Sequence, residues 1–366
     1  MYRYPTTTMG MITSIAPDIR EAKTLPASIY SDQVLFETMR KNLFRNTWQW
    51  LGDNLRFQSG YTQVPEQLLP GYLDIPLIMT QREGRLQVLS NVCTHRASLL
   101  VDEPRTGPLI KCPYHGRCFG LDGKYRSMPE FEQTADFPSD KDHLRPLPSG
   151  TVGPLVFTSM NPRDPFEAVF QDMAQWMDFY PWDQLYHYDH TVYTVHAHWA
   201  LYCDNYLEGF HVPYVHPGLN ANLDMPSYET RLFPHSNLQI GIAGPDQPHL
   251  SIPASHAFGD KQVYAFYWWV FPNMMFNFYP WGLSMNVVTP ETPTLTRIHY
   301  HTYLMKDADP EAFHRTGIHQ TELEDEAIVE KVQQGINSGL YEYGRFSATQ
   351  EKGVHHFHQL LSQWIK

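Results

Sequence analysis

Hydrophobic and polar residues alternate in short stretches between residues 44 and 160, and prolines and glycines separate these stretches. Alternation with a period of two is typical of half-buried β-strands, so the pattern predicts a small all-β domain there. Before it, Asp32 to Leu43 has helical spacing, and residues 1–43 are expected to be an N-terminal extension with this helix. The segment Asn161 to Pro165 is expected to be a linker, because prolines bound it.

The pattern changes after residue 166. The stretch from Val263 to Val288 is the most apolar part of the chain. Five residues interrupt it: Pro272, Asn273, Asn277, Pro280 and Gly282. No span of bilayer length remains, and the aromatic and β-branched content predicts two buried strands around a turn. With the helix-like, acidic segment Glu322 to Gln333, this predicts an α+β domain at 166–366, an antiparallel sheet wrapped around helices.

The composition narrows the class of protein. Hydrophobic residues make up 42% of the 366 residues and aromatic residues 14%, which is typical of an ordered globular protein. The net charge of −12 argues against a nucleic-acid partner, because such a partner needs a basic surface. The N-terminus has no signal-peptide pattern and no membrane span is expected, so a cytoplasmic protein is predicted. Four cysteines are too few for a disulfide framework in a chain of this length.

Two of the cysteines are spaced with histidines in a way that indicates a metal site. Cys93 and His95 form a C-x-H pair, and after a gap of sixteen residues Cys112 and His115 form a C-x2-H pair. Each pair places one thiolate and one imidazole on a tight loop. Zinc accepts two sulfurs and two nitrogens, and so does a Rieske [2Fe–2S] centre. The mixed pairing favours the Rieske centre, because zinc fingers pair like ligands.

The stretches Asn91-Val-Cys-Thr-His-Arg96 and Lys111-Cys-Pro-Tyr-His-Gly116 closely resemble the two cluster-binding loops of the Rieske family. The resemblance implies that 44–160 is a Rieske domain. It also implies the cluster ligands, which are Cys93, His95, Cys112 and His115.

Two departures from the family pattern are informative. Oxygenases of this family usually carry Trp after the second His-Gly, where this chain has Arg117 and then Cys118. Respiratory carriers of the family have an extra disulfide-bonded Cys in each loop, where this chain has Ser98 and Tyr114. The loops therefore resemble those of oxygenases, and Cys118 is expected to be a buried thiol.

A second group of metal-ligand residues lies downstream. On a helix Glu208 and His211 would share a face, but His211 and His216, five residues apart, would be separated by about 140°. Pro213 is expected to unwind the helix locally, so that both imidazoles converge, and Pro217 is expected to end it. Two histidines and a distant carboxylate would form a 2-His-1-carboxylate facial triad, although a hydrolytic zinc site could use the same ligands.

The third ligand is expected in the acidic segment at 322–333. That segment resembles the C-terminal motif of Rieske oxygenases, in which the Asp of a Glu-Asp pair is the iron ligand. The motif maps onto Asp325, and the sequence does not exclude its neighbours Glu324 and Glu326. The resemblance also implies that Glu208 bridges two histidines across a subunit boundary, at a position commonly occupied by Asp. Asp204 is a candidate auxiliary acid.

The resemblance implies an oxygenase component that uses O2 and two electrons to hydroxylate or oxidatively dealkylate a small organic substrate. The implied cofactors are the Rieske [2Fe–2S] cluster and a mononuclear Fe(II), within a helix-grip-like catalytic domain. NAD(P)H would supply electrons through a flavin or iron–sulfur reductase, with or without a ferredoxin. Electron transfer between subunits implies a homo-oligomer, and a head-to-tail trimer satisfies this requirement.

Glu at the bridging position is similar to the branch that acts on quaternary ammonium compounds, such as choline, carnitine and betaine. A trimethylammonium group favours an aromatic cage, for which the candidates are Tyr202, Tyr206, Trp268, Trp269, Tyr279 and Trp281, with Tyr206, Trp268 and Trp281 preferred. Two alternatives remain open from the sequence. One is an aromatic-ring hydroxylating dioxygenase, and the other is a Rieske electron-transfer protein without catalysis.

Overall fold

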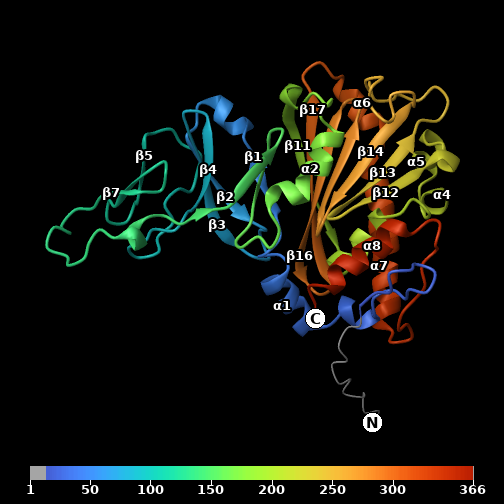
Figure 1. Cartoon of the computed structure of the whole chain (residues 1–366), viewed down its shortest axis with the longest axis horizontal. Coiled ribbons are helices and arrows are strands. Elements are labelled where there is room, and N and C mark those ends of the chain that lie inside the picture. The colour runs from blue at the N-terminus through green and yellow to red at the C-terminus, as the bar shows by residue number, and fades with distance from the viewer. Residues whose placement is uncertain (1–13, 366) are drawn as a thin grey trace, which may run out of the picture.

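The computed structural model describes residues 14–365, and its strands pair only antiparallel among these residues. It confirms the predicted α+β class (Figure 1). The predicted N-terminal helix is α1 (Gln33–Asn42), and Asp32 caps it by accepting hydrogen bonds from the backbone amides of Val34 and Leu35. No helix in the described part of the chain is long and apolar enough to cross a membrane.

The first half of the chain consists of short strands and turns, as the alternation predicts. The strands are β1 (Gln49–Asp53), β2 (Gln63–Leu68), β3 (Ile75–Arg82), β4 (Arg85–Ser90), β5 (Leu109–Lys111), β6 (Cys118–Gly120), β7 (Tyr125–Ser127), β8 (Pro146–Leu147), β9 (Ser149–Val152) and β10 (Leu155–Thr158). They form three small sheets, of which β5-β6-β7 lies at one end of the molecule (Figure 1). A separate small core that includes Ile110, Phe119 and Leu144 supports this end.

The second half is built on a seven-stranded sheet in the order β11-β17-β16-β15-β14-β13-β12. Its strands are β11 (Leu185–Val195), β12 (Glu229–Phe233), β13 (Ser236–Ile242), β14 (Val263–Val270), β15 (Met274–Tyr279), β16 (Gly282–Thr292) and β17 (Leu295–Met305). The prediction of two strands within Val263 to Val288 is wrong, because this stretch contributes to three. Its proline-containing interruptions lie in two separate turns, and each turn reverses the chain.

Helices cover both faces of this sheet. They are α2 (Phe166–Trp176), α3 (Trp199–Tyr206), α4 (Val212–Val215), α5 (Pro217–Asn222), α6 (Pro310–Arg315), α7 (Ile318–Asn337) and α8 (Lys352–Ser362). The rings of Trp268 on β14 and Trp176 on α2 lie 6.3 Å apart, whereas the neighbouring Trp269 lies 5.3 Å from Phe357 on α8. Alternation along β14 therefore places α2 on one face and α8 on the other.

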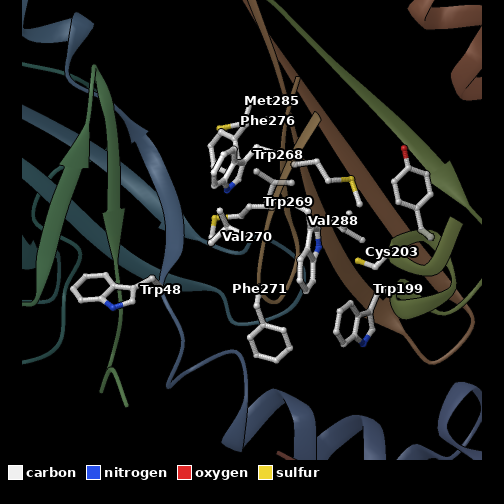
Figure 2. Packing of buried hydrophobic residues seen from close by; sticks show 14 of the residues in the cluster. Trp48, Trp199, Cys203, Trp268, Trp269, Val270, Phe271, Phe276, Met285 and Val288 are labelled. Carbon is white, nitrogen blue, oxygen red and sulfur yellow. The ribbon is translucent and has the colours of Figure 1, made fainter. Parts of the chain in front are cut away.

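The core between these layers is mainly aromatic and sulfur-containing. Figure 2 shows Trp268, Phe276 and Met285 in one group, with Trp199 and the thiol of Cys203 near α3. The N-terminal segment is tied to the C-terminal part of the chain, because the amides of Thr24 and Ala27 donate to carbonyls of residues 344 and 342. This close packing and these terminal hydrogen bonds hold α3 and α7 in place, and both helices contribute to the candidate iron site.

The chain from α3 to α5 differs in detail from the expected single unwound helix. The helix stops at Tyr206, and the interruption lies at residues 207–211 rather than at Pro213. Pro213 is in the first turn of α4 and Pro217 is the first residue of α5, so Pro217 begins a helix and does not end one. Both prolines occupy positions where the missing N–H leaves no intrahelical bond unmade. The predicted acidic helix is present within α7.

Two candidate metal centres

The two Cys/His loops share one backbone design. The amide of Cys93 donates to the carbonyl of Ser98 and the amide of Cys112 donates to that of Arg117, each at 2.8 Å. Near the end of each loop, Ala97 and Gly116 have positive φ values of 56° and 74°. Glycine adopts this conformation without a Cβ clash, whereas Ala97 adopts it at a conformational cost. Each loop therefore turns its cysteine and its histidine toward the other loop.

The four predicted cluster ligands come together at the tip of this region. The rings of His95 and His115 lie 4.8 Å apart, and the thiols of Cys93 and Cys112 are close enough for each to shift the pKa of the other. Both cysteines are buried, whereas His115 is exposed. Two buried sulfurs and two nitrogens at the surface are the donor set of a Rieske [2Fe–2S] centre, so these residues fit that group.

Backbone amides surround the sulfur of Cys112. Burial by itself raises the pKa of this thiol, but hydrogen bonds from the amides of Tyr114 and His115 outweigh burial and lower the pKa. Amides directed at a sulfur favour its thiolate form, which is the form that binds metal. The loop backbone is therefore suited to hold a negatively charged sulfur ligand.

Arg117 occupies the position where oxygenases of this family usually have Trp. Its guanidinium is buried and donates to Thr94 Oγ1 at 2.8 Å and to Asp142 Oδ1 at 3.1 Å. The ring of Phe137 lies 5.0 Å from it, within the range of a cation–π contact. Arg117 thus connects the second loop to Thr94 in the first, while the neighbouring Cys118 is half-buried rather than buried as expected.

The second centre combines three segments that are distant in the sequence or separated by a helix break. His211 lies in the interruption after α3, His216 lies between α4 and α5, and Asp325 lies on α7. One ligand atom of each lies within 4.8 Å of the other two. His216 Nε2 is 3.0 Å from Asp325 Oδ1, and His211 Nε2 is 3.6 Å from the same oxygen. Two imidazole nitrogens and one carboxylate oxygen fit the facial triad of a non-haem iron.

A second carboxylate lies behind each histidine. Glu208 Oε1 accepts from His211 Nδ1 at 2.6 Å, and Glu324 Oε2 accepts from His216 Nδ1 at 2.8 Å. A hydrogen bond at Nδ1 fixes the tautomer, so that the lone pair of Nε2 faces the shared point. The sequence left Glu324 open as a metal ligand, and the structure places it behind His216.

Asp204 is held away from this centre. Its carboxylate accepts from Tyr30 Oη at 3.0 Å and is 2.9 Å from His358 Nε2. It lies one helical turn before Glu208, on the side of α3 that faces the N-terminal segment and α8. The structure therefore places Asp204 in a buried polar cluster that connects three segments of the chain.

A cavity of about 100 Å³ opens beside the three ligands. Seven of the lining residues are tyrosines, namely Tyr202, Tyr206, Tyr228, Tyr264, Tyr267, Tyr279 and Tyr300. Four carboxamide side chains complete its polar lining, namely Asn205, Gln239, Asn277 and Asn286. The sequence indicated Tyr202, Tyr206 and Tyr279 for substrate and missed the other four tyrosines. The available signal was the presence of polar residues within otherwise apolar strands.

The three tryptophans proposed for substrate, Trp268, Trp269 and Trp281, lie outside this lining. Trp268 is fully buried on the opposite face of β14, where its ring stacks at 5.0 Å on Phe233. Trp281 lines an adjoining cavity and stacks at 5.0 Å on Tyr279, one of the lining tyrosines. Side chains of a strand alternate between its two faces, and the sequence alone did not show which face each residue of β14 takes. In the structure, Trp268 points away from the cavity.

Glu322, one turn before Asp325 on α7, is a buried acid behind two of the lining tyrosines. It accepts hydrogen bonds from the hydroxyls of Tyr202, at 2.6 Å, and Tyr300. Burial, reinforced by the charge of Asp325, raises the pKa of Glu322 to about 8. A protonated carboxyl therefore lies close to the metal ligands at neutral pH.

These two sites define an iron-containing redox protein with one cluster centre and one mononuclear centre. The sequence matches the family described as ring hydroxylating alpha subunit (catalytic domain) over residues 182–366, and the Rieske [2Fe-2S] domain over residues 63–138. Among curated relatives, choline monooxygenase, chloroplastic, of Arabidopsis thaliana is 28% identical over 385 residues, covering 97% of this chain and 86% of that protein. The carnitine monooxygenase oxygenase subunit of Escherichia coli (strain K12) is 28% identical over 368 residues, or 95% of each chain.

Solved structures show the same fold. The quaternary ammonium Rieske monooxygenase CntA in complex with an inhibitor has a TM-score of 0.80 at 21% identity and covers 97% of this chain and 100% of its own. Naphthalene 1,2-dioxygenase from Rhodococcus sp. has a TM-score of 0.71 at 18% identity, with 93% and 94% covered.

The chain belongs to the ring hydroxylating alpha subunit family of Rieske non-haem iron oxygenases. It is an oxidoreductase whose cofactors are a Rieske [2Fe–2S] cluster and a mononuclear iron, and it uses O2, a small-molecule substrate and a reductase partner. This outcome confirms the predicted class and excludes the alternative of an electron carrier without catalysis.

Proposed function

We propose that this oxygenase component acts on a small quaternary ammonium compound whose other end is uncharged. The relatives named as choline and carnitine monooxygenases point to this class of substrate. The observation in this chain that supports it most is the cavity of tyrosines beside His211, His216 and Asp325. The faces of aromatic rings attract a trimethylammonium group by cation–π interaction, by about 0.5–2 kcal/mol.

The cavity offers no side chain that would pair with an anionic group of a substrate. None of its lining residues within 14–365 is a lysine or an arginine. A substrate carboxylate would therefore be buried without a partner, which is costly. The adjoining cavity contains Arg315, but this guanidinium is mostly exposed and already pairs with Asp309 at 3.0 Å. A choline-like hydroxyl tail fits the carboxamides of the lining better than the carboxylate of carnitine.

An arene is the alternative substrate, and the cavity lining argues against it. A purely apolar ring would leave the buried hydroxyl of Tyr267, which has no hydrogen-bond partner among residues 14–365, without one. The small volume also favours a compact molecule, because pockets for larger ligands measure roughly 300–1,000 Å³. Oxidation of a carbon next to the ammonium nitrogen, by hydroxylation or dealkylation, is the reaction that this substrate class offers.

The residues of the two centres are assigned roles within this proposal. Cys93, His95, Cys112 and His115 hold the cluster in a domain at 44–160, and His211, His216 and Asp325 hold the iron in a domain at 166–366. When bound, the cluster supplies electrons one at a time and the ferrous iron provides the place where O2 is activated. Within the chain, Glu208 and Glu324 keep the protons of His211 and His216 on Nδ1.

The substrate is oriented by the cavity, and protons have a source behind its lining. The tyrosine rings fix the ammonium end, so that a neighbouring carbon faces the iron ligands. Reduction of O2 consumes protons, and Glu322 is protonated at neutral pH because burial raises its pKa to about 8. Tyr202 and Tyr300, which hydrogen-bond to Glu322 and line the cavity, connect this acid to the reacting end of the substrate.

Electron transfer between subunits fits the placement of the two centres. The cluster loops lie with β5 and β7 at one end of the molecule, whereas α4, α5 and α7 lie in the other half (Figure 1). Tyr114 beside His115 is 64% exposed at the cluster tip. On the other side, a depression of about 620 Å³ reaches Glu208 and His211. A head-to-tail homotrimer would dock the tip of one subunit into the depression of the next, and a flavin or iron–sulfur reductase, with or without a ferredoxin, would reduce the cluster.

The test is O2 uptake by the reduced holoenzyme with a panel of substrates that share one ammonium head. Choline is expected to stimulate uptake with a matching amount of oxidised product, and carnitine is expected to do so less. 3,3-Dimethylbutanol has the shape of choline without its charge and is the matched control. Equal stimulation by choline and this control would contradict the ammonium assignment, and stimulation only by arenes would replace it with ring hydroxylation.

A further inference from the structure

A third group of metal-ligand side chains lies on the opposite face of the large sheet from the iron site. His190 on the edge strand β11 is paired directly with His301 on β17, and His299 is two residues earlier on the same face of β17. The intervening Tyr300 points to the other face, where it bonds Glu322 behind the cavity lining. Alternation along β17 therefore separates this histidine group from the iron site by the thickness of the sheet.

The three imidazoles are as close together as the ligands of the iron site. One nitrogen of each lies within 4.8 Å of the other two, the same limit that the triad of His211, His216 and Asp325 meets. His190 Nε2 and His299 Nδ1 are 3.2 Å apart. Two imidazole nitrogens on one tetrahedral zinc ion are about 3.4 Å apart, so this pair already has nearly the required spacing.

The donor atoms are available to an ion. His301 is only 7% exposed, and its Nδ1 has no hydrogen-bond partner among residues 14–365. Burial is the main cause that lowers the pKa of His301 to about 2 and that of His299 to about 4, and neighbouring imidazoles add to it. Burial also lowers the pKa of His190. All three are therefore neutral at pH 7, and neutral imidazole is the form that binds metal.

The group faces an open space through which an ion can enter. A cavity of about 650 Å³ lies between the sheet and the segment from β1 to β2, and all three histidines line it. Asp53 and Glu66 line it from the other side together with Arg56 and Lys306, so its charged lining is balanced and does not oppose the entry of an ion. The edge position of β11 leaves His190 exposed, which allows its ring to turn.

The alternative is a stack of neutral rings with no ligand. The rings of His190 and His301 are nearly parallel, at 7° and 4.1 Å, and coordination requires the rings to rotate out of this stack so that their nitrogens converge. In the stack, His190 Nε2 and His299 Nδ1 hydrogen-bond to each other, but the buried Nδ1 of His301 has no partner among residues 14–365, whereas an ion would satisfy it.

We propose that His190, His299 and His301 form a third metal site, which binds one divalent transition ion of the zinc type and leaves a position open toward the cavity. Three histidines with one open position are the ligand set of an exchangeable zinc site. The site is independent of the oxygenase reaction, since it lies on the other face of the sheet. It connects β11 to β17 and is expected to stabilise this edge of the sheet when metal is bound.

The test is zinc binding to the holoenzyme with both iron centres loaded, measured by equilibrium dialysis and elemental analysis. The wild-type protein is expected to take up about one extra zinc ion per chain. His190→Ala removes an exposed ligand without opening the core, and it is expected to weaken binding at least about tenfold. His196→Ala, an exposed histidine just beyond the end of β11, is the matched control and is expected to bind zinc as the wild type does.

The same titration in the His211→Ala background separates this site from the iron site. The extra zinc ion is expected to remain in that background, and zinc is expected to raise the unfolding temperature of wild type but not of His190→Ala. Equal zinc binding by wild type and His190→Ala, no uptake by wild type, or loss of the extra ion only with His211→Ala would each overturn the proposal.

Discussion

The cluster loops and the iron site are built in opposite ways. The four cluster residues lie between Cys93 and His115, on loops closed by their own backbone hydrogen bonds, and the histidines are at the surface. The iron-site residues are His211, His216 and Asp325, and the contact between His216 and Asp325 spans 109 positions of sequence. Here His216 is buried and each histidine has a carboxylate behind it.

The difference follows from what each centre must do. A cluster that exchanges electrons benefits from a ligand near the surface, and its redox chemistry depends on local amides around sulfur. A site that activates O2 beside a substrate requires groups from several elements around a closed cavity. The first can be encoded by a short motif, whereas the second depends on the whole sheet and on α7.

The largest effects are expected when one of the two centres is removed at a time. Cys112→Ala is expected to abolish the visible absorption of the cluster but to leave iron binding at the second site. His211→Ala is expected to abolish product formation and leave the cluster spectrum intact, because the two centres lie in different halves of the molecule (Figure 1). Absorption spectra, iron content and product yield measure both effects. Retained turnover in His211→Ala would remove this residue from the iron site.

Glu208→Gln tests whether electron transfer between the centres can be lost while both metals stay bound. The carboxamide can still accept from His211 Nδ1, so both metals are expected to remain bound. Product formation is expected to fall by roughly a hundredfold, because loss of the charge disturbs the path by which electrons arrive. Single-turnover oxidation of the reduced cluster, followed by stopped flow, measures this step. Glu326→Gln on α7 is the control, and an unchanged rate in Glu208→Gln would reject the bridging role.

Mixed oligomers test whether the two centres cooperate between chains. Cys112→Ala and His211→Ala are each expected to be inactive alone, while co-expressed chains are expected to recover about a quarter of wild-type activity. This fraction follows because half of the donors and half of the acceptors at each head-to-tail boundary are intact. Product yield from co-purified, differently tagged chains measures it. No recovery in oligomers shown to contain both chains would place electron transfer within one chain.

The smallest predicted effect concerns protons at the iron site. The native protein keeps Glu322 protonated up to about pH 8, whereas the unfolded chain releases this proton above its ordinary value of 4.5. Between these pH values the native state binds more protons, so its free energy of unfolding falls as pH rises, by up to about 1.4 kcal/mol per pH unit. Glu322→Gln is expected to flatten this dependence. Unfolding midpoints measured from pH 5 to pH 8 would show it, and parallel curves would contradict the raised pKa.

The sequence predicted the local parts of the molecule well and the nonlocal parts incompletely. Cys93, His95, Cys112 and His115 were recognisable because their spacing is a property of two short loops. The helix break was misplaced to Pro213, since proline is tolerated in a first turn and the interruption depends on how residues 207–211 pack.

The cavity was the hardest part to predict. Its tyrosines come from α3 and from several strands, and their direction depends on strand register, which a bulge between Gly241 and Ile242 shifts along β13 and β14. For the same reason Trp268 was assigned to the substrate although it faces α2. Glu322 gave no signal of its own, because an acid in an acidic helix is usually exposed, and only the contacts with Tyr202 and Tyr300 reveal its burial.

The most direct test of the central claim is a single turnover of the reduced holoenzyme with choline under ¹⁸O2. We predict that the cluster is oxidised rapidly only when choline is present, that choline is oxidised, and that one atom of the label is found at the oxidised carbon when the product is trapped before its carbonyl oxygen exchanges with water. The same protein with 3,3-dimethylbutanol is expected to show neither effect. Cluster oxidation that is equally fast without an ammonium compound, or choline that is left unoxidised, would contradict the proposal that this oxygenase acts on a quaternary ammonium substrate.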